Sequence, residues 1–222
     1  MLDAKKLLDQ LVGSGAAGGF AGGLAGGAVA NAFMGKKGRK LTQSAVKLGG
    51  LALVGGLAYK AWQNHKQASG APAPAQAMTP ASNPVAPVPP GTGFLPAPGD
   101  EAGTQALSQL MVRAMISAAK ADGDIDTRES QMILQQVNSL PLDDEAKAYL
   151  FAEYARPLDL PGLVAAVDSP EHAAEVYAAS LLVVHPASAA EQFYLDSLAR
   201  GLRLEAGLVQ ELHTAVQSSA TA

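Results

Sequence analysis

The sequence predicts an all-α protein: a helical domain of two similar helical hairpins, preceded by glycine-rich membrane helices and a disordered proline- and alanine-rich linker. Three observations lead to this class. Apolar residues recur at helical spacing between residues 104 and 217. Two capping boxes in the same stretch mark helix starts. No stretch shows the strict alternation of apolar and polar residues that is typical of a half-buried strand.

Composition and charge divide the chain into three predicted regions, residues 1–66, 67–103 and 104–222. Residues 1–66 hold nine Lys or Arg and two Asp, whereas residues 100–222 hold seven Lys or Arg and 18 Asp or Glu. A basic, apolar first region suits an anionic membrane surface. An acidic body repels phosphates, so we expect no nucleic-acid partner. The absence of Cys excludes disulfides, thiolate metal sites and thiol nucleophiles.

The first region begins with a predicted amphipathic helix, Met1–Val12, in which Leu7, Leu8 and Leu11 share one face. Residues 10–35 then carry no charge, and their glycines recur in pairs every four residues. This period places Gly19, Gly23 and Gly27 along one helical ridge. In lipid such a ridge permits close helix packing, so we expect a homo-oligomer contact there.

A basic cluster at residues 36–40 separates that run from an apolar run at 41–62, which ends in Tyr59 and Trp62. Aromatic residues at this position are typical of a membrane–water interface. Two arrangements remain open: a helical hairpin with the basic cluster at its tip, or a single span at 41–62 with the glycine-rich run packed beside it. A flexible segment in water is the third interpretation.

The second region, 67–103, contains nine prolines within residues 72–98 and no charge before Asp100. It has almost no large apolar residues, so it cannot build a core and is expected to be an extended, disordered linker.

The third region is expected to be helical throughout. Helix starts are marked by Asp143, by Ser169 followed by Pro170, and by the capping boxes Asp126–Glu129 and Ser188–Glu191. The predicted helices cover 105–121, 126–139, 143–155, 159–167, 170–184, 189–201 and 205–217.

An internal repeat relates the two halves of this region. A shift of 62 residues aligns Glu129 with Glu191 and Ile133 with Leu195, so a helix, a turn and a capped helix occur twice. Two similar helical hairpins on one core are a common α architecture.

The most distinctive short stretch is the acidic turn, which we define as Asp122, Asp124, Asp126 and Glu129. Carboxylates at alternate positions followed by a Glu offer the oxygen ligands that a hard divalent cation requires. The alternative is purely structural, because Asp126 and Glu129 also form a capping box and Asp122 starts a turn. No catalytic constellation accompanies the turn, so we expect no enzyme and no cofactor other than a candidate divalent cation.

Two motifs resemble known families. AAKADGDIDTRES is similar to the D-G-x-I-D-x-x-E signature of the TerB-like (tellurite-resistance) fold. GGLAGGAVANAFMGKKGRKL followed by GGLALVGGLAYKAW resembles the YebE-type bacterial inner-membrane proteins, a family of unknown function. The resemblance implies an all-helical TerB-like domain held at the inner (cytoplasmic) membrane, an association with stress response, and an acidic site at Asp122, Asp126 and Glu129. Asp124 would be an additional acid in this chain.

Together these features predict a membrane-anchored, non-enzymatic TerB-like interaction or stress-response module. Its partners would be the lipid bilayer and a protein bound by the acidic helical domain. The alternative is a divalent-metal sensor that uses the acidic turn.

Overall fold

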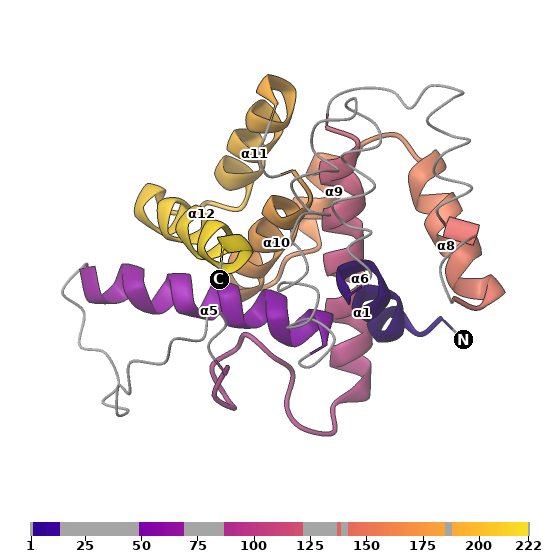
Figure 1. Ribbon diagram of the computed structural model, residues 1–222, viewed down its shortest axis with the longest axis horizontal. Coiled ribbons are helices and arrows are strands. Elements are labelled where there is room, and N and C mark those ends of the chain that lie inside the picture. Colours follow the sequence, from indigo (N-terminus) through magenta and orange to yellow (C-terminus); the bar gives the residue numbers. More distant parts are fainter. Residues whose placement is uncertain are drawn as a thin grey trace.

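A computed structural model describes residues 2–13, 49–68, 87–121, 137–138, 142–184 and 188–221 (Figure 1). Every regular element within these residues is a helix, which confirms the all-α class. The second helix of the first predicted hairpin, 126–139, lies outside them except for residues 137–138, so the two-hairpin arrangement stays a prediction. The helices are α1 (Ala4–Gly13), α5 (Gly50–Ala68), α6 (Glu101–Ala119), α8 (Asp144–Ala155), α9 (Leu160–Ala165), α10 (Pro170–Val183), α11 (Ala189–Gly201) and α12 (Ala206–Thr221).

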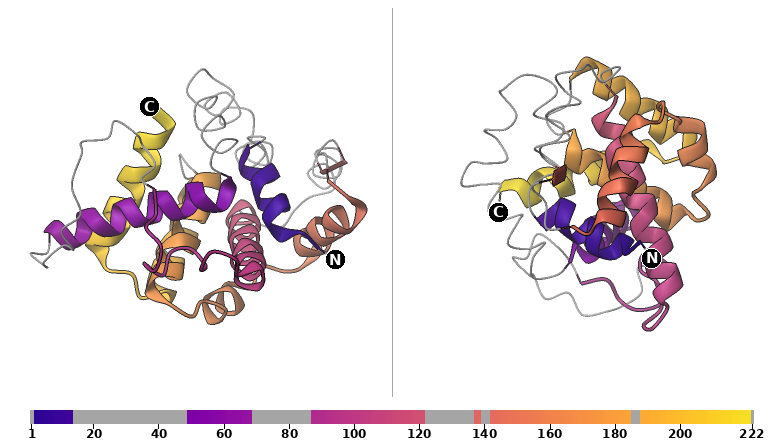
Figure 2. Two further views of the ribbon diagram at one scale, coloured as in Figure 1. Left: turned by 90° about the horizontal axis from the view of Figure 1, so that it is seen from below. Right: turned by 90° about the vertical axis from the view of Figure 1, so that its right-hand side faces the viewer.

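Helix α10 lies at the centre of the fold, and residues 173–183 are all buried. It packs against α6 on one side and against α5 and α12 on another. Helices α5 and α12 also pack against each other, and α1 covers α5 and α6 (Figures 1 and 2). One apolar core therefore includes helices from both ends of the chain.

Helix α1 has the amphipathic character that its sequence predicts, because Leu7, Leu8 and Leu11 are all buried. The Gln105 side-chain carbonyl of α6 accepts a hydrogen bond from the Ala4 backbone amide at 2.6 Å. Asp3 accepts another from the Lys6 amide at 2.9 Å. These contacts satisfy amides at the start of α1 that have no partner inside the helix.

Helix α5 differs from the expectation of a membrane helix with interfacial aromatic residues. Leu53, Val54 and Leu57 are completely buried in the protein core. Tyr59 and Trp62 pack edge-on against Phe94, with ring centroids 5.5 and 5.7 Å apart. A run of Gly, Ala and Leu is apolar enough to be buried in protein or in lipid, so its hydropathy alone did not distinguish the two. Within the described ranges, no helix has both the length and the hydropathy that crossing a bilayer requires.

The end of the predicted linker is ordered, contrary to expectation. Residues 87–96, which we call the strap, run across α5 and insert Phe94, whose side chain is only 1% exposed. Gly91 and Gly93 have φ angles of +79° and +82°, a region that favours glycine. Helix α6 then begins at Glu101, three residues earlier than the predicted start of the helical domain at 104, because Asp100 caps it.

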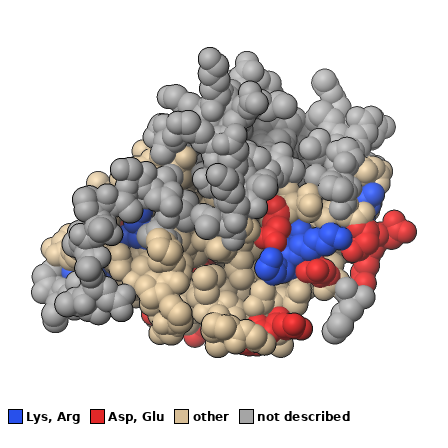
Figure 3. All heavy atoms as spheres, turned by 60° about the horizontal axis from the view of Figure 1, so that its bottom comes forward, with Lys and Arg blue, Asp and Glu red and all other residues tan. Residues whose placement is uncertain are grey.

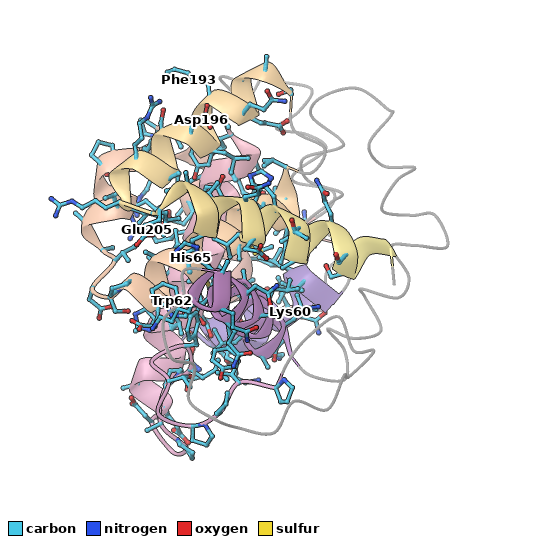
Figure 4. All side chains as sticks on the ribbon, turned by 90° about the vertical axis from the view of Figure 1, so that its left-hand side faces the viewer. Lys60, Trp62, His65, Phe193, Asp196 and Glu205 are labelled. Carbon is cyan, nitrogen blue, oxygen red and sulfur yellow. The ribbon has the colours of Figure 1, made fainter. Side chains whose placement is uncertain are left out.

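Several predicted helix starts are confirmed. Asp143 and Ser169 accept hydrogen bonds as N-caps of α8 and α10, and Ser188 and Glu191 form the complete capping box of α11. At the far end of α8, the Lys120 ammonium donates to the backbone carbonyl of Arg156. His65 of α5 lies 3.0 Å from Glu205, just before α12 begins, so these two helices also meet through polar contacts (Figure 4).

Candidate functional site

The residues predicted as sites from the sequence lie outside the described part of the chain. This applies to the acidic turn, with Asp122, Asp124, Asp126 and Glu129, and to the glycine ridge of Gly19, Gly23 and Gly27. Within the described ranges, no three His, Asp or Glu side chains are placed to hold a metal ion. Metal binding at the acidic turn therefore stays a prediction.

The described residues form a groove along α6 with a volume of about 710 Å³. From α6 it is lined by Gly103, Ala106, Leu107, Leu110 and Arg113, which recur at helical spacing on one face. The lining part of α6 is about 15 Å long, because ten residues of helix rise by that length. A groove of this length can hold a short segment of a partner protein. The other lining residues are Gly93, Leu95, Pro96, Asp100, Gln109, Glu153, Arg156, Ala166, Asp168 and His172.

Most charges in the groove are already paired within the protein. Asp168 accepts a hydrogen bond from His172 at 2.6 Å, which lowers the pKa of the Asp168 carboxyl. Glu153 and Arg156 form an ion pair at 2.7 Å. On the face in Figure 3, basic and acidic side chains likewise lie beside each other among the described residues. These pairs therefore add little to the net electrostatic potential in the groove.

Two charged lining residues stand outside these pairs: Asp100, which accepts the Gly103 amide as the N-cap of α6, and Arg113. The Arg113 side chain is half-buried in the groove, and no hydrogen bond or ion pair joins it to another described residue. The nearby Tyr149 hydroxyl is buried, and burial together with the Glu153 charge raises its pKa, whereas Arg113 acts in the opposite direction. A guanidinium that has no partner in the described part of the chain offers a planar set of donors that suits a carboxylate or phosphate. The lining residues include no hydroxyl, thiol or amine nucleophile.

A second polar feature is buried beneath the strap. Glu175 of α10 is 0% exposed, and neither of its carboxylate oxygens has a hydrogen-bond partner among the described residues. Burial raises the pKa of Glu175 to about 9, and the charge of Glu171 adds to the effect. The carboxyl lies over Gly55 of α5, where a β-carbon would be only 3.0 Å from it.

Comparison with known proteins places the chain in a family. Residues 18–216 match a family described as "Protein of unknown function (DUF533)". The chain belongs to the DUF533 family. A protein of Yersinia enterocolitica, described as "Uncharacterized protein in ampR 5'region", is 26% identical over 114 residues, which cover 50% of this chain and 82% of that protein. No solved structure matches the chain.

The DUF533 match has two consequences. It agrees with the expectation of a family of unknown function, and it assigns no activity. It also runs from the glycine-rich segment into α12, so segments that the composition divides into three regions belong to one family unit. The packing of α5 between α10 and α12 agrees with a single unit.

Sequence reasoning missed both Arg113 and Glu175. Each had a detectable signal: a charged residue inside a helical stretch that is otherwise apolar, MVRAMI for Arg113 and AAEVYA for Glu175. A charge in such a position is rarely buried unless it is paired or functional.

Proposed function

We propose that this DUF533 protein is a membrane-associated, non-enzymatic binding module whose α6 groove receives an acidic side chain of a partner protein. The observation that carries the proposal is Arg113, a cation in a groove where Glu153 is paired with Arg156 and Asp168 with His172. A carboxylate from a partner would complete the pairing, and charge-assisted pairs of this kind are stronger than neutral hydrogen bonds. The TerB-like and YebE-type resemblances, and a stress-response role at the inner membrane of a bacterium, are part of this proposal.

The membrane part of the proposal is supported by where α1 ends and α5 begins. Asp9 of α1 accepts a hydrogen bond from the Gly50 amide of α5 at 2.6 Å. The intervening sequence, with its uncharged glycine-rich run and its basic cluster at 36–40, therefore leaves and returns to the folded domain at one place. A segment that is tied at both ends would meet an anionic bilayer from one side. The glycine ridge remains our proposed contact between copies of the chain.

A vesicle experiment tests the membrane part. Sedimentation with phosphatidylglycerol vesicles compares the wild type with K36Q/K37Q, and with R200Q/R203Q as a control that removes the same charge from the helical domain. Each basic residue near an anionic surface contributes about 1 kcal/mol. The first variant should therefore bind roughly 30-fold more weakly and the control should bind like the wild type. Equal binding of all three proteins would contradict the proposal.

A titration tests the groove. We would add a glutamate-rich hexapeptide to the isotope-labelled full chain and follow the backbone amide signals of residues 103–113. The peptide should shift these signals in the wild type and in R200Q, whose arginine is exposed on α11 and does not line the groove. It should leave them unchanged in R113Q. Equal shifts in R113Q and the wild type would show that Arg113 is not the binding group.

A further inference from the structure

Glu175 presents a physical problem that the proposed function does not explain. A carboxyl group that is removed from water without a hydrogen bond destabilises a fold, and such groups are rare in native proteins. Here both oxygens lack a partner among the described residues and the side chain is 0% exposed. A feature with this cost calls for a physical role in the molecule.

The charges around Glu175 do not compensate for its burial. Among the described residues, Glu171, one turn earlier on α10, is the only charged group that acts on it, and it opposes ionisation. Residues 50–59 of α5 and all of the strap carry no charge. Described titratable groups on the other helices that pack against α10, such as Arg113, Asp196 and His213, do not act on Glu175. The carboxyl therefore stays protonated at neutral pH as long as water is excluded.

The strap lies next to this carboxyl. Leu95 lies 3.2 Å from the position of a β-carbon on Gly55, beside the Glu175 carboxyl. A β-carbon on Gly93 would likewise lie 3.2 Å from the Glu171 side chain. Phe94 is the only fully buried side chain of the strap, and Thr92 bonds only within it, to the Pro89 carbonyl at 3.0 Å.

The strap also forms one wall of the α6 groove, through Gly93, Leu95 and Pro96. We propose that Glu175 is a proton-dependent switch for the strap: with its proton the carboxyl stays buried and the strap closes over α5, and loss of the proton opens the strap and removes that wall of the groove. The consequence for partner binding rests on the proposed function of the groove. The movement itself does not.

The direction of the pH dependence follows from the two environments. The pKa of Glu175 is about 9 when the strap is closed and returns toward the ordinary 4.5 when water reaches the carboxyl. Between these values only the open form gains from losing the proton. The ratio of open to closed strap therefore rises by up to about tenfold for each pH unit. Acid closes the strap and alkali opens it.

Trp62 is the only tryptophan of the chain, and the centroid of its ring lies 5.7 Å from that of Phe94. Its fluorescence should therefore report movement of the strap. The test follows the full chain between pH 5 and pH 10 with three signals: the carboxyl resonance of Glu175, the ring resonances of Phe94 and the emission of Trp62. Opening should shift the Trp62 emission to longer wavelength and change the Phe94 resonances together with the ionisation of Glu175. In E175Q both changes should disappear.

A matched variant and an internal control make the test decisive. E171Q removes a carboxylate from the same helix but keeps Glu175, so it should retain the transition and move it to lower pH. The transition would be unrelated to Glu175 if E175Q showed it unchanged. Ionisation of Glu175 without a change at Phe94, or no ionisation below pH 10, would also overturn the proposal. So would loss of the Val216 methyl signals of α12 at the same pH, because the whole fold would then be responding.

Failure of this inference is distinguishable from failure of the proposed function. The strap measurement uses no peptide and no lipid, so its result does not depend on whether Arg113 binds a partner. If the strap opens as proposed, the hexapeptide should bind less tightly at pH 9 than at pH 6 in the wild type, and equally at both in E175Q.

Discussion

The Asp9 carboxylate accepts a hydrogen bond from the Gly50 backbone amide at 2.6 Å, and so a residue of α1 caps the start of α5. These residues are separated by 40 positions of sequence that carry a basic cluster and a long uncharged run. Gly49, next to Gly50, has a φ angle of +81° and lies against the same carboxylate. The two helices thus form one corner of the domain, from which the glycine-rich segment leaves and to which it returns.

Removal of this cap should lower the stability of the whole fold. D9A leaves the Gly50 amide without its acceptor and should reduce the free energy of unfolding by about 0.5–2 kcal/mol, the usual effect of a lost N-cap. Urea unfolding monitored by far-ultraviolet circular dichroism measures this. K5Q removes the exposed ion pair of the same carboxylate and should change the stability by less than about 0.5 kcal/mol. Equal losses in both variants would contradict the capping role.

The buried carboxyl should make the global stability depend on pH in a defined direction. Glu175 has a pKa of about 9 in the folded protein, above its ordinary 4.5. Its contribution to stability is therefore complete at pH values below 4.5 and decreases as the pH rises to 9. E175Q removes this dependence, so at pH 7 it should be more stable than the wild type by up to about 3 kcal/mol. The gap should close below pH 4.5, and a gap that is independent of pH would contradict the assignment.

The two phenylalanines Phe94 and Phe193 provide a matched pair of substitutions. Phe94 is buried between Tyr59 and Trp62, so F94A should cost about 3–5 kcal/mol and move the Trp62 emission to longer wavelength. Phe193 is 70% exposed on the outer side of α11 (Figure 4), and F193A should change the stability by less than about 0.5 kcal/mol. Thermal unfolding with tryptophan fluorescence tests both, and an F94A loss as small as that of F193A would show that Phe94 contributes nothing to the core.

Metal binding at the acidic turn has a selective test. D122N/D124N removes two candidate ligands and leaves both residues of the predicted capping box, Asp126 and Glu129, unchanged. If the turn binds a divalent cation, calorimetric titration of the wild type with Ca²⁺, Mg²⁺, Mn²⁺ or Zn²⁺ should give heat that this variant abolishes and the control D144N retains. The absence of heat from the wild type at millimolar metal would remove the metal-sensor alternative.

The parts of the fold that the sequence predicted well are those with local causes. Ser188 and Glu191 cap α11 through contacts three residues apart, and the leucines of α1 follow from helical periodicity. Both signals involve residues that are close in sequence, so they can be read without knowing how the rest of the chain folds.

The parts that were missed depend on distant contacts. The place of α5 in the core requires α10 and α12, and a composition of Gly, Ala and Leu does not reveal which apolar environment it meets. The strap was expected to be disordered because the proline-rich region has almost no large apolar residues, yet Phe94 anchors it between two rings of α5. The exceptional chemistry of Glu175 and Arg113 arises from what surrounds them in space.

The position of α5 determines how this protein should be divided for study. The proline-rich composition suggests a fragment that starts at α6. Such a fragment would expose the apolar faces of α10 and α12 that α5 covers, and it should aggregate. Because these faces are complementary to α1 and α5, residues 1–80 and 81–222 produced together as two separate polypeptides should reassemble into one soluble complex.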